Sequence, residues 1–336
     1  MSKKNLQVEG IRGITILMIV LFHIFCRYQQ IYYDTEIVWM KYWGSFGVTI
    51  FLLISAYFLY TPPKEHFQFQ FFRYLGKKAL RLWPAYFVSI TIIFITLTLF
   101  YLPERTVGLK DYLLNIFFIN GFIKTPYVDG AHWYLTVLIS AIIICGVIQK
   151  IRLSEKWFVY IIWAALSAIL SKFHIMVVSE LLGGVYTGII ICGIALHQLV
   201  LLNSRTEDKK KLTPEYLKIA AIGVTGIVFT LFCTDVEHGI ELIIALPLLY
   251  FVMQQKCRIL EWKPLVFIGG ISYYLYLIHQ NIAFCIEYYM TQNIGSFSYL
   301  YGLAAFAAVI LLSVVMWLVS QWIHKYIVSK KKSSNV

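Results

Sequence analysis

The sequence contains about ten apolar runs that are each long enough to cross a lipid bilayer as a helix, since a crossing helix needs about 17 to 25 residues. With 60% hydrophobic and 14% charged residues, the chain carries more apolar surface than a water-soluble core could hide. We therefore expect one all-α domain over residues 1–336, a polytopic membrane bundle of about ten helices. The expected spans lie near 10–27, 44–60, 82–101, 131–149, 156–172, 177–202, 216–233, 239–255, 265–290 and 297–324.

The placement of lysine and arginine predicts the orientation, because loops with many basic residues stay in the cytoplasm. With the N-terminus inside, the basic residues left on the outer side are Arg27, Lys41, Arg105, Lys110, Lys124 and Lys172. The other basic residues, including Lys3, Lys4, Lys64 and Lys209 to Lys211, fall in loops on the inner side or at the ends of the chain. Both termini are thus predicted to be cytoplasmic, and the net charge of +12 follows from topology without any nucleic-acid partner.

Two further segments are amphipathic or interrupted. The stretch from Tyr112 to Ile123 is too short to cross and contains polar residues, which favours an interfacial or re-entrant segment. The stretch from Phe67 to Leu82 predicts a helix with a basic ridge, formed by Arg73, Lys77 and Arg81. This ridge suits either anionic lipid headgroups or a phosphorylated ligand.

Ionisable residues inside a span are costly, so each is a candidate for function. In the first span, Arg12 and His23 lie about 20° apart in angle and about 16 Å apart in height on an ideal helix. In the ninth, Ser272, Tyr276 and His279 form one polar stripe. The two histidines have similar depth and can meet if their helices are neighbours. A positive anchor for Arg12 and a satisfied buried imidazole for His23 remain the simpler alternatives.

Other polar residues carry weaker signals. His132 and Trp133 begin the fourth span, where we expect the outer interface and where an aromatic belt is an equally good explanation. The six cysteines are dispersed without a C-x-x-C pair, so we expect neither a disulfide framework nor a metal site.

Taken together, these motifs resemble the acyltransferase-3 family of integral membrane acyltransferases, in its bacterial envelope glycan O-acetyltransferase type. The resemblance follows family order and covers the stretches 9–14 with His23, 47–59, 73–86, 132–135 and 271–279. Ala56 stands where the family usually has glycine, and Leu138 and Ile139 occupy a region where many members carry glutamates. Some relatives carry a fused extracytoplasmic SGNH esterase-like domain, which we do not expect in this chain.

The resemblance implies transfer of an acetyl or other acyl group from cytoplasmic acetyl-CoA to a hydroxyl of an extracytoplasmic or lipid-linked polysaccharide. It implies that Arg12, Arg73, Lys77 and Arg81 hold the phosphates of acetyl-CoA, without any metal. His23 would act as general base or as a transient acyl carrier, and we favour the base.

The remaining implied roles belong to the surroundings of His23. His279, Ser55 and Tyr276 would orient the base or stabilise the oxyanion. His132 and Trp133 would contact the glycan or lipid-linked sugar acceptor. The implied location is a multi-pass position in a membrane, the bacterial plasma membrane, in contact with its lipids.

Two other classes of protein compete with this interpretation. A transporter or exporter of an acylated glycan or small anion would also use buried histidines, although the sequence shows no clear repeat symmetry. A scaffolding membrane protein would not need Arg12 and His23, or the stripe that ends at His279. The sequence leaves the acceptor glycan and the oligomeric state open.

Overall fold

The structure is a computed structural model that describes residues 5–35, 37–62, 69–205, 212–294 and 298–333. Within these residues it is all-helical and contains no strand, which confirms the predicted fold class. The helices of the first half are α1 (Leu6–Phe22), α2 (Tyr28–Tyr32), α3 (Trp43–Tyr57), α4 (Phe71–Leu99), α5 (Leu109–Ile116), α6 (Ile119–Ile123) and α7 (Trp133–Lys150). Those of the second half are α8 (Trp157–Lys172), α9 (Met176–Leu181), α10 (Thr187–Asn203), α11 (Thr213–Phe229), α12 (Val236–Met253), α13 (Lys263–Ile294) and α14 (Tyr299–Ser333).

Eight helical stretches of the described chain are long and apolar enough to cross a membrane. They are Leu6–Tyr32, Val38–Tyr57, Phe71–Leu99, Gly130–Lys150, Gly184–Asn203, Thr213–Thr234, Val236–Met253 and Tyr299–Ile323. The other two expected spans correspond to α8, an apolar helix of 16 residues, and to α13, whose middle carries buried polar side chains. The chain is therefore a multi-pass membrane protein, whereas the count of ten and the cytoplasmic termini stay predictions. Lys3, Lys4, Lys64 and Lys209 to Lys211 lie outside the described residues.

The expected span 177–202 is wrong as a single helix. The chain forms α9 and then α10, with a turn between them at Gly183 and Gly184. These two glycines have φ of +96° and +56°, values in the left-handed region that an α-helix cannot contain. Hydropathy does not detect the break, because both pieces are apolar.

The basic helix expected from Phe67 to Leu82 also differs in the structure. Phe67 lies outside the described residues, and α4 runs without interruption from Phe71 past Pro84 to Leu99. The basic ridge is thus the first half of a membrane-crossing helix. Pro84 removes one backbone donor but does not end the helix.

The short segment from Tyr112 to Ile123 packs on the bundle with one side. It breaks into α5 and α6 at Phe118, which has a φ of +59°. Asn115 is fully buried and holds the turn, because its Nδ2 donates to Pro126 O and its Oδ1 accepts from Val128 N. Trp83 Nε1 in α4 donates to Ile116 O over 3.0 Å. One side of the segment therefore packs on the bundle, whereas side chains such as Leu113 and Phe117 are exposed, and both the interfacial and the re-entrant interpretation stay predictions.

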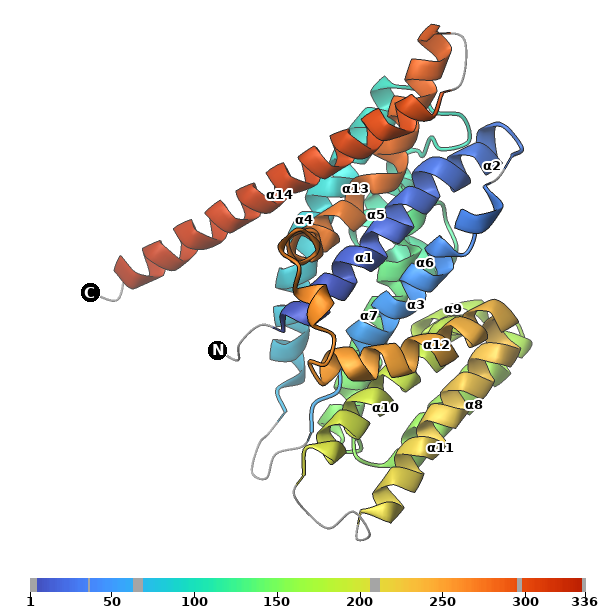
Figure 1. Cartoon of the computed structure of the whole chain (residues 1–336), viewed down its shortest axis with the longest axis vertical. Helices are drawn as coiled ribbons and strands as arrows, with labels where there is room; N and C mark the ends of the chain where they lie inside the picture. The colour runs from blue at the N-terminus through green and yellow to red at the C-terminus, as the bar shows by residue number, and fades with distance from the viewer. Residues whose placement is uncertain (1–4, 36, 63–68, 206–211, 295–297, 334–336) are drawn as a thin grey trace.

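Helices α1 and α13 lie side by side, as Figure 1 shows, and they approach unusually closely. A Cβ atom added to Gly269 would lie 1.8 Å from Glu9 O, and one added to Gly13 would lie 2.2 Å from Leu265 O. Only glycine permits this distance between backbones, as in other membrane helix pairs. The two helices run parallel, and we call the end where α1 begins the proximal end of the bundle and the end where α2 finishes the distal end.

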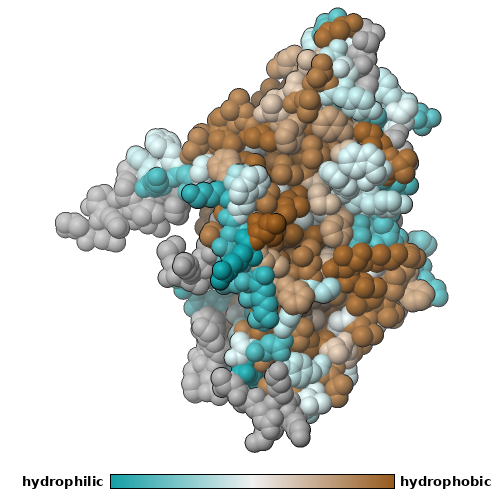
Figure 2. Space-filling model, in the orientation of Figure 1, coloured by the Kyte–Doolittle hydropathy of each residue, from teal (hydrophilic) through white to brown (hydrophobic). Residues whose placement is uncertain are grey.

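The outer surface is apolar, as a lipid-facing protein requires. The face shown in Figure 2 is mostly brown, and large side chains such as Phe72 and Phe232 are 85% exposed. Helix α14 packs on α13 over part of its length, and its C-terminal part projects away from the other helices (Figure 1).

Substitution of Gly269 by alanine tests the helix crossing. The added methyl group would collide with the backbone of Glu9, so α1 and α13 must move apart at a cost of about 1–3 kcal/mol. We expect Gly269→Ala to lower the thermal unfolding midpoint in detergent and to reduce the yield of folded protein. Gly270→Ala is the matched control, because nothing lies within 4 Å of its added Cβ. Equal behaviour of the two variants would contradict the close crossing.

Candidate functional site

The α1–α13 crossing brings His23 and His279 into contact. His23 Nδ1 lies 3.3 Å from His279 Nε2, and the two rings meet edge to face with centroids 4.8 Å apart. His279 is fully buried, whereas His23 is partly exposed. A π-helical turn, His23–Arg27, begins at the first histidine. Such turns in α-helices are frequently found at functional sites.

Neighbouring carbonyl groups fix which nitrogen of each ring carries the proton. His279 Nδ1 lies 2.8 Å from Tyr276 O, and His23 Nδ1 lies 2.8 Å from Ile19 O. Because a carbonyl oxygen only accepts, both Nδ1 atoms must carry hydrogen. His279 Nε2 therefore has a free lone pair and shares the single His23 Nδ1–H with Ile19 O, as the more distant of the two acceptors. His23 Nε2 is then unprotonated, and it makes no hydrogen bond to any described residue.

His132 begins the fourth span, as expected, and its side chain points into the bundle towards α13. Its Nε2 donates to Leu277 O over 2.9 Å, it is 1% exposed, and its Nδ1 has no hydrogen-bond partner among the described residues. The chain just before it is buried at Val128 and Asp129, which brings His132 into the bundle. Trp133 points elsewhere and stacks on Tyr186, with ring centroids 4.6 Å apart.

The segment that carries His132 is clamped to α13 around His279. Asn281 donates its backbone N–H to Asp129 Oδ2 and its Nδ2 to Val128 O, over 3.0 and 2.8 Å. Tyr276 donates its hydroxyl to Ala131 O over 2.7 Å. These contacts hold the turn of α13 that contains His279. Sequence reasoning missed Asp129 and Asn281, and only the Asp-Gly pair before the fourth span hinted at a turn there.

A second polar layer lies on the proximal side of the histidines. Arg12 Nη2 donates to Ser272 Oγ over 2.8 Å, and its Nη1 pairs with Glu9 Oε1 at 3.3 Å. Arg12 and Ser272 are therefore brought together, as their positions on the two helices require. The pair closes the proximal side of the α1–α13 interface with a cationic group.

Ser55 contacts a tyrosine and neither of the two histidines. Its hydroxyl lies 2.8 Å from the hydroxyl of Tyr134 in α7. The Tyr134 ring in turn meets the Tyr276 ring edge to face, with centroids 5.5 Å apart. Ser55, Tyr134 and Tyr276 thus form a chain of contacts that leads from α3 to the turn of His279.

The basic ridge on α4 is open to its surroundings. Arg73, Lys77 and Arg81 are exposed, and no ion pair to a carboxylate is found for them in the part of the chain that the structure describes. Lys78 faces inward instead, with its Nζ 5.5 Å from the centre of the Tyr74 ring. Next to Arg81, Leu82 O accepts a hydrogen bond of 2.7 Å from the Tyr273 hydroxyl. This bond joins the residue after Arg81 to the residue after Ser272, so the end of the ridge lies near the Arg12–Ser272 contact.

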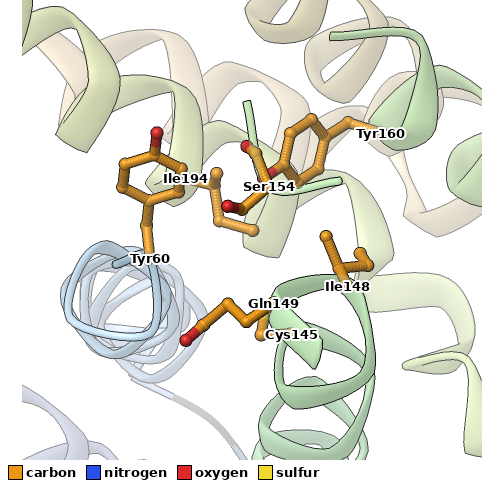
Figure 3. Close-up of a pocket in the computed structure, with 7 residues that line it drawn as sticks. All are labelled: Tyr60, Cys145, Ile148, Gln149, Ser154, Tyr160 and Ile194. Atoms are coloured by element: carbon orange, nitrogen blue, oxygen red, sulfur yellow. The ribbon is translucent and has the colours of Figure 1, made fainter. Parts of the chain in front are cut away.

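One small pocket lies apart from the histidines, near the ends of α3 and α7 (Figure 3). Tyr60, Gln149 and Tyr160 line it, and Tyr160 donates its hydroxyl to Ser154 O. Gln149 Oε1 is buried and has no hydrogen-bond partner in the described part of the chain. The lining contains no charged or histidine side chain, so we assign no reaction to it. Among the described residues, no group of histidine, cysteine and carboxylate side chains could hold a metal ion.

Comparison with known proteins identifies the family. A family model described as an acyltransferase domain, that of the acyltransferase-3 family, matches residues 5–320 and so covers nearly the whole chain. No curated protein and no solved structure matches the chain. The matched range contains the histidine pair, the Arg12–Ser272 contact and the basic ridge. The chain therefore belongs to the acyltransferase-3 family and is a multi-pass membrane acyltransferase.

Proposed function

We propose that the protein transfers an acetyl group from acetyl-CoA, bound at the proximal end, to a sugar hydroxyl that enters from the distal end. The observation that carries this proposal is the contact of His23 Nδ1 with Ile19 O and His279, from which we infer that His23 Nε2 carries a free lone pair. A neutral imidazole with a free lone pair is a suitable general base for a hydroxyl nucleophile.

The reaction requires one proton transfer and one exchange of bonds at the acyl carbon. His23 Nε2 takes the proton of the acceptor hydroxyl as its oxygen attacks the thioester carbonyl. The new C–O bond forms, the C–S bond breaks, and the released thiolate receives the proton from His23. Acetyl-CoA supplies only the activated acyl group. His23 is thereby returned to its starting state, and no covalent acyl-enzyme is needed.

His279 supports the base through its ring orientation. Its Nδ1–H is directed to Tyr276 O, so its Nε2 accepts from His23 Nδ1–H and keeps the His23 ring in place. The Tyr276 hydroxyl is occupied by Ala131 O, so its backbone carbonyl is the group that acts on His279. Ser55 acts one contact further away through Tyr134, which makes it a positioning residue in this proposal.

The exposed basic residues at the proximal end suit a donor that carries several negative charges. Arg73, Lys77 and Arg81 form an exposed cationic ridge, and Arg guanidinium groups match phosphate geometry. Arg12 stands between this end and the histidines, about 16 Å below His23 by helix rise. In this proposal the ridge holds the phosphates of the donor, and the extended arm of the donor follows the α1–α13 interface to His23.

For the acceptor we propose a polysaccharide or lipid-linked sugar on the outer side of a bacterial plasma membrane, with capsule or exopolysaccharide preferred. The unpartnered Nδ1 of the buried His132 is a hydrogen-bond acceptor that suits a sugar hydroxyl. Trp133 would offer a ring for stacking beside Tyr186.

The activity is tested with purified protein in nanodiscs, labelled acetyl-CoA and extracted envelope glycan. We expect release of CoA and labelled, alkali-labile esters on the glycan. If the protein gives no turnover with any glycan but moves acetylated glycan across vesicles, it is a transporter and the proposal is wrong.

Substitution of His23 tests the base. We expect His23→Ala to lower the rate of acetyl transfer by about a hundredfold to ten-thousandfold, the usual contribution of a general base. His174→Asn is the control, because His174 is exposed and its positive φ of 55° is tolerated by asparagine. The rates are compared at equal amounts of folded protein. A fully active His23→Ala variant would rule out this assignment.

The role of His279 is tested by two variants of similar size. Gln offers a carbonyl oxygen that accepts from His23 Nδ1–H, whereas Leu offers none. We therefore expect His279→Gln to retain more transfer activity than His279→Leu, with the difference in kcat and little change in KM for the donor. If both lose the same activity, the hydrogen bond between the histidines has no part in catalysis.

The proposed binding of the donor by the basic ridge is tested by substituting an exposed residue, because such a change affects the stability of the protein little. We expect Arg81→Gln to raise KM for acetyl-CoA about tenfold, as for the loss of a charge-assisted hydrogen bond, with kcat nearly unchanged. Lys218→Gln, on α11, serves as the control because its Nζ pairs with Glu215 at the surface. An unchanged KM in Arg81→Gln, and also in Arg73→Gln, would place donor binding elsewhere.

A further inference from the structure

The side chain of Arg105, from a loop at the distal end, lies near the part of α13 that follows His279. The loop of residues 100–108 is fixed to α2, because the Tyr32 hydroxyl donates to Pro103 O over 3.1 Å and Leu102 is fully buried. Arg105 N donates to Leu102 O, which turns the chain inward. The Arg105 guanidinium then lies 5.6 Å from the centre of the Phe284 ring in α13.

The backbone of Gly130 has both this guanidinium and the Gln280 amide group beside it. A Cβ atom at residue 130 would lie 3.0 Å from Arg105 Nη1 and 3.4 Å from Gln280 Oε1. Both groups therefore lie against the same side of the Gly130 backbone, where a side chain would crowd them. Gln280 directly follows His279, so these groups lie one residue along α13 from the histidine pair.

Arg105 and Gln280 can each form hydrogen bonds to a ligand beyond those that they form within the protein. Gln280 is 4% exposed, and its Oε1 has no hydrogen-bond partner within the described residues. Arg105 is partly exposed and forms no ion pair with a described carboxylate. The adjacent Asp129 does not fill the role, since its oxygens accept from Ala131 N and Asn281 N. A buried amide oxygen without a donor costs free energy, so a ligand that supplies one gains affinity.

These two groups together specify the chemistry of a ligand. The guanidinium requires an anionic acceptor, whereas Gln280 Oε1 requires a hydroxyl or another donor. The partly exposed Tyr32 ring supplies apolar surface of the kind on which sugar rings pack, whereas the Phe284 ring is fully buried behind it. A sugar that carries both an acidic group and hydroxyl groups meets all three conditions, and a neutral sugar meets only two.

We propose that Arg105, Gln280 and the Tyr32 ring, beside Gly130, form an acceptor subsite that selects an acidic sugar unit, with Arg105 binding its carboxylate or phosphate. This inference rests on the proposed function, because the subsite would hold the acceptor whose hydroxyl is presented to His23. The anion has two chemical sources, a uronic acid within the glycan or the phosphate of a lipid-linked sugar, and the same guanidinium serves either.

Binding measurements without a donor test the subsite independently of catalysis. Full-length protein in nanodiscs is titrated with three probes: a glucuronic-acid disaccharide, the corresponding glucose disaccharide and glucose 1-phosphate. We expect an acidic probe to bind at least about tenfold more tightly than the neutral disaccharide, with a preference that weakens as salt is raised. Preference for the first probe identifies a glycan carboxylate, and preference for the third identifies a sugar phosphate.

Substitution of Arg105 tests whether this residue causes the preference for the acidic probe. We expect Arg105→Gln to remove the preference for the acidic probe and Arg105→Lys to retain part of it. Arg27→Gln is the matched control, because Arg27 is an exposed arginine of the π-helical turn whose Nη1 donates to Gln30, and it should keep the preference. Equal binding of acidic and neutral probes, or a preference that survives in Arg105→Gln, would overturn the proposal.

The binding test of the subsite can fail or succeed independently of the acetyl-transfer test of the proposed function. Release of CoA from acetyl-CoA by the unmodified protein is measured in parallel with the titrations. If acetyl chemistry is present but no acidic preference exists, the subsite is wrong and the acyltransferase proposal stands. If an Arg105-dependent preference exists without acetyl chemistry, the subsite stands and the reaction proposed above is wrong.

Discussion

The close contact between the backbones of α1 and α13 is the constraint on which the rest of the site depends. Gly10, Gly13 and Gly269 leave room for a carbonyl oxygen of the opposing segment where any other residue would place a Cβ. In a bilayer, lipid is as apolar as a leucine side chain, so such packing and hydrogen bonds between helices hold a bundle together. The same contact brings Arg12 to Ser272 and His23 to His279. A separation of these helices would therefore disrupt both polar layers.

The two layers divide the bundle into regions of different chemistry. The exposed residues of the α4 ridge make the proximal side cationic, with Arg12 paired to Glu9, whereas the histidines lie deeper along the α1–α13 interface. The carbonyls of Ile19 and Tyr276 set the proton positions on the two histidine rings, because a helix backbone offers oxygens that only accept. The membrane becomes part of the proposed reaction path, since the donor and the acceptor reach His23 from opposite ends.

Hydropathy and spacing predicted much of this arrangement. Apolar runs indicated the helical class, and the matched depths of His23 and His279 indicated that they could meet. The contact itself depends on glycines that have no pattern distinct from ordinary membrane glycines. The break at Gly183 and Gly184 and the inward position of His132 were missed for a related reason, because both depend on backbone conformations that apolar composition does not encode. Asp129 and Arg105 were missed because they lie in loops, where only tertiary contacts assign a side chain its partner.

The central claim is that His23 and His279 act as one unit in acyl transfer, and a double-mutant cycle tests it most directly. The rate of acetyl transfer is measured for the unmodified protein, His23→Ala, His279→Leu and the variant with both changes. Residues that act as a unit give non-additive losses, so we expect the double variant to be about as slow as His23→Ala alone. If the two losses instead multiply, the histidines act independently, and their contact has no role in the transfer step.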